Sequence, residues 1–365
     1  MSNSDTGLQI DDDTLWDIDF DDLELEDEIA SGAFGVVYKG SYCGTTVAVK
    51  QLFEPDNEII QKLLAREVQI LQSLRHPNVV NFMGLCNHET GVYIVTEYVG
   101  GGHLWSVLKN TSAFPNLSWI QRVQFAIDVS QAMNYLHKRK MLHRDLKTKN
   151  LLVDEHMRVK VCDFGFARTI DNSAENIYMT KTGTGLWMAP EMYMGKPYSS
   201  KADVFSFGVI LREIITRSKP PERRPRDQFG FDLDEFRKDV PSDCPPAFLQ
   251  LALDCSATNP DDRPDFVDIL RASKLLKVQL TKQQQQQQQD TSTASSSSPA
   301  PAPPARRGRR RGDIQTTVLA TPVNPPTIPA RQPTTVLLPD TDKIASSNNN
   351  NNNDLKTTTT TNNNS

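Results

Sequence analysis

A glycine-rich segment near the start of the chain has residue types that allow close approach to phosphate. It reads Ile29-Ala-Ser-Gly32-Ala-Phe-Gly35-Val-Val37, and its glycines leave room for backbone N–H groups to meet phosphate oxygens. A dinucleotide-binding turn is not expected, because Ala30 occupies the place of its first glycine and a strand-like stretch follows where a helix is needed. A P-loop is excluded, since no GxxxxGK followed by Ser or Thr occurs. A phosphate-covering hairpin and an ordinary hairpin turn both remain open.

A lysine and a glutamate are predicted to form an ion pair. Lys50 ends the strand-like run Val47-Ala-Val-Lys50 and shares the face of Ala48. Glu67 lies on a helical stripe that is otherwise apolar, formed by Ile60, Leu64, Leu71 and Leu74. A lone carboxylate on such a stripe is costly to bury unless it is paired. Lys50 is its natural partner, although a lysine on a strand is more often solvated.

Three further segments combine acidic, basic and amide side chains. They are His143-Arg-Asp-Leu-Lys-Thr-Lys-Asn150, Asp163-Phe-Gly165 and Ala189-Pro-Glu191. Together with the glycine-rich segment and Lys50, in this order and spacing, they resemble the signature set of eukaryotic protein kinases. The resemblance covers roughly Trp16 to Leu280. It implies phosphoryl transfer from ATP to protein hydroxyl groups, which needs positioning and charge neutralisation more than covalent chemistry.

The resemblance implies a role for each motif residue, with ATP and Mg²⁺ as the cofactors. Lys50 holds the α- and β-phosphates, Glu67 orients Lys50, and Asp145 accepts or orients the substrate hydroxyl. The expected catalytic residues are Asp145, Lys147, Lys50 and Glu67, and the expected metal ligands are Asn150 and Asp163. The residues expected to contact the nucleotide are Ile29, Ala30, Ser31, Gly32, Ala33, Phe34, Gly35, Val36, Val37, Ala48, Lys50, Thr96, Glu97 and Val99. Because Ala30 departs from the usual first glycine, we expect altered ATP affinity rather than lost activity.

Other positions follow from the same resemblance. Thr96 is the expected gatekeeper, and Glu97 and Val99 are the expected backbone partners of adenine. Asp203 is expected to anchor the loop that carries Asp145. Arg263 is expected to pair with Glu191 in a buried salt bridge. A stacked apolar column is expected from Leu71, Phe82, His143 and Phe164, for which a pure packing role is the alternative.

The elements that must position these residues change in character along the chain. Strand-like runs dominate from residue 23 to residue 97, interrupted by a helical pattern over residues 56–74. Residues 79–82 are among the predicted strands. A capping box at Ser118-Trp-Ile-Gln121 starts a helix, and a strongly apolar helix, expected to be buried, runs from about Ser200 to Ile215. The sequence predicts an α+β, two-lobed protein kinase fold with a small antiparallel β-rich N-lobe and a larger helical C-lobe.

Composition divides the chain into three parts. Residues 1–15 are predicted to be an acidic flexible N-terminus, residues 16–281 the kinase domain with its core at about 23–280, and residues 282–365 a disordered tail. From Gln283 onward the chain consists of a polyglutamine run, a Ser/Ala/Pro stretch, an Arg cluster, and Asn and Thr tracts. Such segments hold too few large apolar side chains to offset the entropy lost on ordering. The preceding block is long enough to bury a substantial core.

Net charge, cysteine pattern and hydropathy indicate the cellular compartment and the kind of partner to expect. The formal net charge of −5 gives no hint of nucleic acid or membrane as a partner. The five cysteines include no CxxC pair, which favours a reducing compartment. Neither a long apolar run nor a signal-peptide pattern is present, and Ser2 stands where myristoylation requires a glycine. We expect a cytoplasmic or nuclear protein. Its expected partners are protein substrates and an upstream activating kinase. Binding to a membrane or to nucleic acid is not expected.

Two places predict the kinase subclass. Lys147, two residues after Asp145, is the form typical of serine/threonine kinases. The stretch Gly183-Thr-Gly-Leu-Trp-Met-Ala-Pro-Glu191 and the opening Trp16-x-Ile18 resemble the tyrosine-kinase-like group, whose members mostly phosphorylate serine and threonine. The expected function is a serine/threonine kinase in intracellular signalling. Dual specificity and a pseudokinase scaffold that only binds are the alternatives.

The polar stretch between Asp163 and Glu191 is the expected activation segment. A phosphate there, paired with the guanidinium of Arg144, would order the segment. The favoured sites are Thr180 or Thr182, followed by Ser173 and Tyr178, with Thr184 a poorer candidate. A constitutively ordered loop is the alternative.

Overall fold

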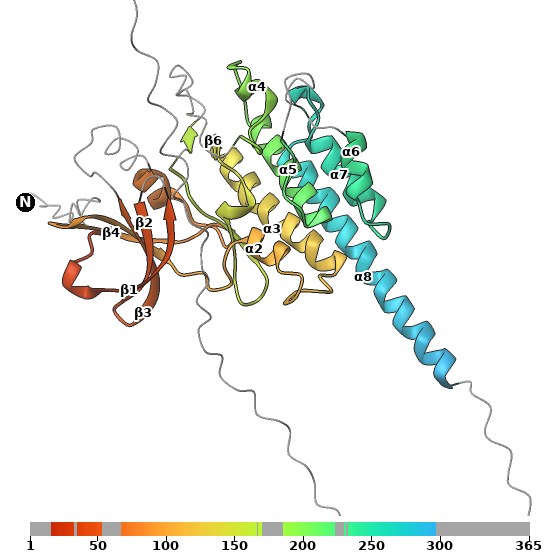
Figure 1. The fold of residues 1–365 in the computed structure, drawn as a ribbon, viewed down its shortest axis with the longest axis horizontal. Coiled ribbons are helices and arrows are strands. Elements are labelled where there is room, and N and C mark those ends of the chain that lie inside the picture. The colour runs from red at the N-terminus through yellow and green to blue at the C-terminus, as the bar shows by residue number, and fades with distance from the viewer. Residues whose placement is uncertain are drawn as a thin grey trace, which may run out of the picture. The chain divides into compact units, whose positions relative to one another are not determined.

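Five antiparallel strands form a sheet in the first part of the chain. The structure, a computed structural model, describes residues 16–32, 35–52, 67–165, 167–169, 185–222, 230 and 233–296. The strands are β1 (Leu23–Gly32), β2 (Gly35–Tyr42), β3 (Thr45–Leu52), β4 (Phe82–His88) and β5 (Gly91–Glu97), in the spatial order β1-β2-β3-β5-β4. Every neighbouring pair is antiparallel. Figure 1 shows these strands grouped together in red and orange.

Strand β3 has the two faces that its sequence predicts. Val47 and Val49 are fully buried in a small apolar cluster under the sheet. Ala48 and Lys50 alternate with them and are only partly buried. Lys50 is paired with a residue of β2 on one side and of β5 on the other. The lysine is therefore carried by a strand in the interior of the sheet, where its backbone position is tightly fixed.

The prediction of a strand over residues 79–82 is wrong. Strand β4 begins at Phe82, and Val79 and Val80 precede it. The Val80 N–H donates to the carbonyl of Val161 (2.9 Å), and the Val161 N–H donates to the carbonyl of Asn78 (2.8 Å). Both valines are buried, but they pair with the second part of the chain instead of the sheet. This stretch therefore joins the two lobes.

The second part of the chain is mainly helical. Its helices are α2 (Leu104–Lys109), α3 (Trp119–Lys138), α4 (Pro190–Tyr193), α5 (Lys201–Thr216), α6 (Leu233–Asp239), α7 (Pro246–Cys255) and α8 (Phe266–Ser296). Two short ladders pair β6 (Met141–Leu142) with β9 (Arg168–Thr169) and β7 (Leu151–Val153) with β8 (Val159–Val161). Ser118 caps α3 by accepting the Gln121 N–H (3.2 Å), as predicted. The predicted α+β fold, a small antiparallel sheet with a larger helical lobe, is confirmed.

Helix α5 is the buried centre of the helical lobe. Every residue from Ala202 to Ile215 is buried, as expected for a helix that is apolar on nearly all sides. It packs against α2, α3 and α7 (Figure 1). Its buried polar side chains include Asp203, Ser206 and Glu213. Each of these needs a hydrogen-bond partner inside the protein.

Helix α8 is longer than the sequence predicts. We expected a disordered tail from residue 282, but α8 continues through the glutamine run to Ser296. The disorder prediction is therefore wrong for residues 282–296, and residues 297–365 lie outside the described part. Glutamine is a good helix former, and extending an existing helix avoids the cost of nucleating a new one. The side chains from Lys282 to Asp290 are exposed, so packing does not hold this extension.

A chain that ends at Lys282 should melt at the same temperature as the full chain, because residues 283–290 of α8, which it lacks, are exposed. A chain that ends at Ala272 should melt at least several degrees lower, since it loses the buried side chains of Ser273 and Leu276. Differential scanning fluorimetry of the two shortened chains beside the full chain checks this. Equal melting temperatures for the two would contradict the packing of α8 on the lobe.

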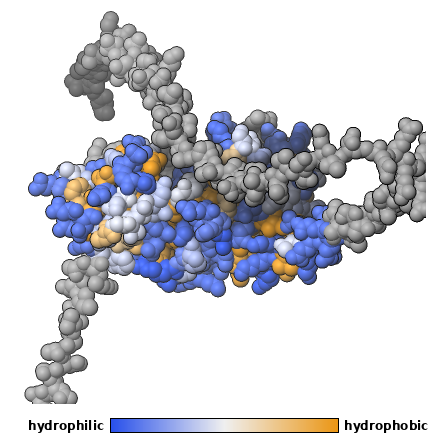
Figure 2. Space-filling model, turned by 90° about the horizontal axis from the view of Figure 1, so that it is seen from below, coloured by the Kyte–Doolittle hydropathy of each residue, from blue (hydrophilic) through white to orange (hydrophobic). Residues whose placement is uncertain are grey.

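The described surface is a mixture of hydrophilic and hydrophobic side chains. The face drawn in Figure 2 is mostly hydrophilic, with small separate hydrophobic areas. Exposed large apolar side chains include Leu275 and Val278 of α8, and scattered exposure of this kind is ordinary. Among the described residues, no helix is long and apolar enough to cross a bilayer.

Candidate active site

Lys50 and Glu67 form the predicted ion pair. Lys50 Nζ lies 2.9 Å from Oε1 and 3.0 Å from Oε2 of Glu67. Lys50 belongs to β3, and Glu67 to a helix whose described part spans residues 67–73. Burial lowers the pKa of Lys50, but the carboxylates of Glu67 and Asp163 outweigh burial and leave that pKa above its usual value. The pair therefore fixes a positive charge close to Asp163.

Asp145 lies in the catalytic loop, residues 143–150, and two donors hold one of its oxygens. Lys147 Nζ (2.7 Å) and Asn150 Nδ2 (3.0 Å) both donate to Oδ2. Both contacts converge on Oδ2, and neither involves Oδ1. Burial raises the pKa of Asp145, while the ammonium group of Lys147 opposes that shift. The carboxyl is thus a stronger base than an exposed aspartate and is kept in one orientation.

Asp203 of α5 anchors the catalytic loop, as predicted. Its Oδ2 accepts the N–H of His143 (3.0 Å), and its Oδ1 accepts the N–H of Arg144 (2.9 Å). His137 Nε2 on α3 lies 2.8 Å from the same Oδ2. Arg144 has a left-handed backbone with φ of 69°, which a residue with a Cβ adopts only where its surroundings enforce it. The two backbone hydrogen bonds to Asp203 supply that restraint.

Asn150 and Asp163 lie at the same end of the β7–β8 ladder. Asn150 directly precedes β7, Asp163 follows β8, and the Cys162 N–H donates to the Asn150 carbonyl (3.0 Å). Asn150 Nδ2 is engaged with Asp145, so its Oδ1 is the atom that can face a cation. Mg²⁺ is commonly held by one or two carboxylates together with substrate phosphates. The two oxygen donors fit this pattern, and the described residues contain no cluster of three His, Cys, Asp or Glu side chains that would suggest another metal.

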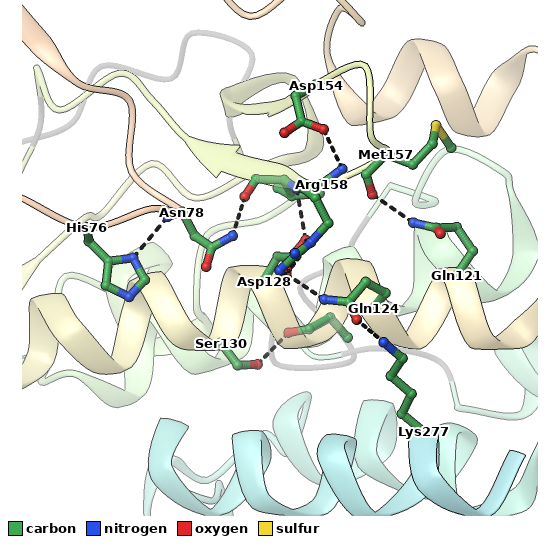
Figure 3. A network of polar contacts seen from close by, with 12 residues as sticks. His76, Asn78, Gln121, Gln124, Asp128, Ser130, Asp154, Met157, Arg158 and Lys277 are labelled. Atoms are coloured by element: carbon green, nitrogen blue, oxygen red, sulfur yellow. Dashed lines mark hydrogen bonds and ion pairs between the residues drawn. The ribbon is translucent and has the colours of Figure 1, made fainter. Parts of the chain in front are cut away.

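A network around Asp128, which sequence analysis missed, holds the same ladder against α3 (Figure 3). The fully buried Asp128 carboxylate accepts Arg158 Nη2 (2.6 Å), Arg158 Nε (2.9 Å) and the Val159 N–H (3.0 Å). Gln124 Nε2 donates to this carboxylate (2.7 Å), and Gln124 Oε1 accepts a hydrogen bond from Lys277 Nζ of α8. Figure 3 shows these side chains meeting between α3, α8 and the ladder. The network therefore fixes the ladder whose end carries the candidate metal ligands.

Replacing Asp128 with alanine should lower the free energy of unfolding by about 1–3 kcal/mol, because the buried Val159 N–H loses its acceptor. The matched control is Asp268→Ala on α8, which breaks only an exposed pair with Arg271 and should cost about 1 kcal/mol or less. Urea denaturation of both variants provides the comparison. Similar losses for the two would contradict the structural role of Asp128.

The predicted nucleotide-contacting residues lie on β1, β2 and β3. Ile29 to Gly32 end β1, Gly35 to Val37 begin β2, and Ala33 and Phe34 lie outside the described residues. A Cβ at Gly35 would collide with the Gln51 carbonyl oxygen, so strand pairing itself requires this glycine. A Cβ at Gly32 would meet no described protein atom within 4 Å. Contacts with the described residues thus do not account for the glycine at position 32, and its approach to a phosphate stays a prediction.

The residues predicted to surround adenine lie at the end of β5 and just after it. Thr96 Oγ1 donates to the carbonyl of Ala48 on β3 (3.4 Å). The Glu97 carboxylate pairs with Lys160 of β8 (2.8 Å), so its side chain joins the two lobes. Val99 is buried. The contacts of these residues with a nucleotide stay predictions.

Two predicted packing features are confirmed. Arg263 Nη1 and Nη2 donate to the two oxygens of Glu191 at 2.7 and 2.9 Å, and both side chains are buried. This fork-like pairing satisfies both charges within the lobe. The rings of His143 and Phe164 have centroids 5.2 Å apart. All members of the predicted apolar column are buried: Leu71, Phe82, His143 and Phe164.

The predicted phosphorylation sites fall in residues 170–184, outside the described part: Thr180, Thr182, Ser173, Tyr178 and Thr184. Arg144, the predicted partner of such a phosphate, is buried. Its guanidinium carbon lies 5.4 Å from the centroid of the Tyr198 ring. The switch therefore stays a prediction.

Glu213 of α5 is a buried carboxyl that sequence analysis did not select. It is 1% exposed and accepts Trp187 Nε1 (2.8 Å) and Thr148 Oγ1 (3.0 Å). Burial raises its pKa to about 8, against the opposing effect of these two hydrogen bonds. A signal was present in the sequence, because Glu213 stands among apolar residues near the end of a helix that is expected to be buried.

Glu213 should make stability fall as pH rises. Its pKa is about 8 in the folded protein against an ordinary value of 4.5, so between these values the folded state keeps a proton that the unfolded chain has lost. The contribution is complete below pH 4.5 and is lost as pH rises through about 8. Glu213→Gln cannot ionise and should gain stability relative to wild type between about pH 5 and about pH 8. A difference in melting temperature that stays constant with pH would contradict this.

Comparison with known proteins gives a family match and close relatives. A sequence model of the family described as protein tyrosine and serine/threonine kinase matches residues 23–272. The chain is 41% identical over 284 residues to RasGEF domain-containing serine/threonine-protein kinase X of Dictyostelium discoideum, an alignment covering 77% of this chain and 29% of the relative. It is 42% identical over 273 residues to probable serine/threonine-protein kinase kinX of that organism, covering 73% and 25%. The chain thus spans less than a third of the length of these two relatives.

Proposed function

The chain belongs to the protein tyrosine and serine/threonine kinase family, and from that premise we propose that it transfers the γ-phosphate of ATP to serine and threonine hydroxyl groups of protein substrates. The relatives named serine/threonine-protein kinases support the acceptor class. The observation that carries the proposal is the Asp145 carboxylate, oriented by Lys147 and Asn150, in one compact unit with the intact Lys50–Glu67 pair. A scaffold that only binds has no need of this arrangement.

The described side chains supply the groups that phosphoryl transfer needs. Lys50 offers a positive charge to phosphate oxygens, and Glu67 fixes its direction. As the substrate oxygen bonds to the γ-phosphorus, the bond from that phosphorus to the ADP oxygen breaks. The hydroxyl proton passes to Asp145 Oδ1. Lys147, 2.7 Å from the other oxygen of Asp145, keeps that carboxylate ionised and in place.

Asn150 and Asp163 are the proposed ligands of Mg²⁺. A bound ion would supply positive charge that offsets the negative charge of the phosphate oxygens. Asp163 has a left-handed backbone with φ of 63°, and Phe164 beside it is buried. The buried phenylalanine and the ladder before it hold this uncommon backbone conformation in place.

We further propose that the chain is a member of the tyrosine-kinase-like group. Its opening segment supports this assignment, since Trp16 and Ile18 are built into the fold. The Trp16 ring lies 5.3 Å from that of Phe82, and the Ile18 N–H donates to the Leu85 carbonyl (2.8 Å). Residues that mark a kinase group, such as Trp16 and Ile18, are expected to have fixed positions in the fold.

The test is transfer of radiolabelled phosphate from ATP by the purified full chain to a degenerate peptide array with Ser, Thr and Tyr acceptors read separately. Label should appear on serine and threonine peptides in the presence of Mg²⁺. Asp145→Asn is the matched control, which separates activity of this chain from a contaminating kinase. Label no greater than that of the control, or label on tyrosine peptides alone, would overturn the proposal.

A further inference from the structure

Lys149 is the exposed residue of the catalytic loop. It lies in the 3-10 turn Thr148–Asn150, whose other two members are buried. Within the described part of the chain, its ammonium group takes part in no hydrogen bond or ion pair, whereas that of Lys147 is bound to Asp145 (2.7 Å). The loop that carries Asp145 therefore presents the charge of Lys149 to solvent.

The backbone of Lys149 lies close to the place where the substrate hydroxyl must react. The next residue, Asn150, donates from Nδ2 to the Asp145 carbonyl (2.9 Å) and carboxylate (3.0 Å). An extended peptide advances about 3.3–3.6 Å per residue. When the accepting serine or threonine of a substrate is at Asp145, residues two or three positions away are thus within reach of the long, flexible side chain of Lys149.

The acidic side chains that contact the catalytic loop do not expose a charge that would oppose Lys149. Asp145 is matched by Lys147, and the Asp203 carboxylate accepts two backbone N–H groups of the loop. Burial raises the pKa of Glu213 to about 8, so this carboxyl is mostly protonated near neutral pH. All three acids are buried. A substrate carboxylate that approaches Lys149 therefore meets no exposed acid of the catalytic loop.

Helix α2 lies on another side of Lys149 and is also free of acidic residues. The helix packs on the 3-10 turn, and neither element contains Asp or Glu. Burial lowers the pKa of His103, the N-cap of α2, and the positive charge of Lys149 adds to this effect. His103 Nδ1 accepts the Ser106 N–H (2.9 Å), as only an unprotonated nitrogen can. The corner between the catalytic loop and α2 thus carries a positive charge near neutral pH.

We propose that Lys149 is a specificity-determining residue, which favours protein substrates with an acidic side chain two or three residues from the accepting serine or threonine. The inference deepens the proposed kinase function and rests on it. An exposed ion pair is weak, so the preference is modest. Glutamate should raise kcat/KM about two- to fivefold over glutamine. Lysine at the same position should be disfavoured, because the ammonium group repels it.

A set of charge-scanning peptides tests the proposal. Each peptide has one serine in an otherwise neutral sequence, with Glu, Gln or Lys placed at one position within about four residues on either side. At a position two or three residues from the serine, kcat/KM should follow the order Glu, Gln, Lys. Glutamate about eight residues away is the control and should have no effect. The preference should shrink in about 1 M salt, which screens exposed charges.

Variants of the chain assign the preference to one side chain. Lys149→Gln should bring the ratio of kcat/KM for the Glu and Gln peptides to about one, Lys149→Arg should keep the ratio, and Lys149→Glu should favour the Lys peptide. The matched control is Lys274→Glu, a charge reversal at an exposed lysine of α8, which should keep the wild-type order. A preference that survives in Lys149→Gln would overturn the proposal. So would a change in the KM for ATP as large as that for peptide, because Lys149 would then act on the nucleotide.

Peptide binding measured by fluorescence anisotropy separates failure of this inference from failure of the proposed function. The wild-type chain should bind the Glu peptide more tightly than the Gln peptide, and Lys149→Gln should bind the two alike. If the wild type transfers no phosphate to any peptide, the proposed function fails, while anisotropy still reports on the charge preference. If it transfers phosphate to the Glu and Gln peptides equally well, the inference alone fails.

Discussion

Replacing Asp145 with asparagine should lower kcat by about 10²–10⁴-fold, with the affinity for ATP and the melting temperature close to wild type. Asparagine has the same shape, and its oxygen can still accept the Lys147 and Asn150 donors that converge on Oδ2. The NH₂ group would then occupy the Oδ1 position, where it cannot take a proton from the substrate hydroxyl. The variant should therefore lose proton transfer and keep the fold of the catalytic loop.

The measurement is kcat from radiolabelled phosphate transfer, beside calorimetric titration of ATP. Asp154→Asn is the matched control, because Asp154 lies in the turn after β7, where it accepts the backbone N–H groups of His156 and Arg158. It should retain kcat within a few-fold. If Asp145→Asn also stayed within a few-fold of wild type, Asp145 would not be the base.

Replacing Lys50 with methionine should lower kcat/KM by about 10²-fold or more, because the phosphates lose a positioned positive charge. The same change leaves the Glu67 carboxyl, 6% exposed, without its cation, so stability should fall as well. These two effects can be separated. The double variant Lys50→Met with Glu67→Gln should recover much of the melting temperature, since the uncompensated acid is gone, but none of the activity.

Lys39→Met is the control for this pair, because Lys39 bonds Glu26 on the same sheet in an exposed position and should leave both activity and stability nearly unchanged. Peptide kinetics and melting curves on the four proteins complete the comparison. An unchanged kcat/KM for Lys50→Met would remove Lys50 from the site. Recovered activity in the double variant would mean that Lys50 is needed only to neutralise Glu67 and does not hold the phosphates.

Several parts of the site were predictable because their chemistry is local or periodic. The Lys50–Glu67 pair followed from a carboxylate on an apolar helical stripe, which must find a cation. The buried helix α5 followed from its lack of a polar face. The Ser118 cap followed from a short-range pattern of residue types. In each case the pattern of residue types lies within one element and can be read from a few consecutive helical turns.

Other parts were wrong or missed, and each depends on which surface an element packs against. Val79 and Val80 are apolar enough for a strand, but their partner is Val161 of the other lobe. The glutamine run lacks apolar groups, yet it continues a helix that was already nucleated upstream. The Asp128 network joins α3, α8 and the β7–β8 ladder, segments that the sequence does not show to be neighbours.

The sequence by itself determined the two-lobed fold and the residue types of the site, because motif spacing and hydrophobic periodicity are encoded along the chain. Only the tertiary structure decided the state of those residues. Burial sets the pKa of Glu213 at about 8, and the approach of Lys147 and Asn150 to one oxygen of Asp145 leaves the other available. The environment of Glu213 arises from groups brought together across tens of residues, and the contacts of Asp145 depend on the backbone conformation of the folded loop, so both exist only once the chain has folded.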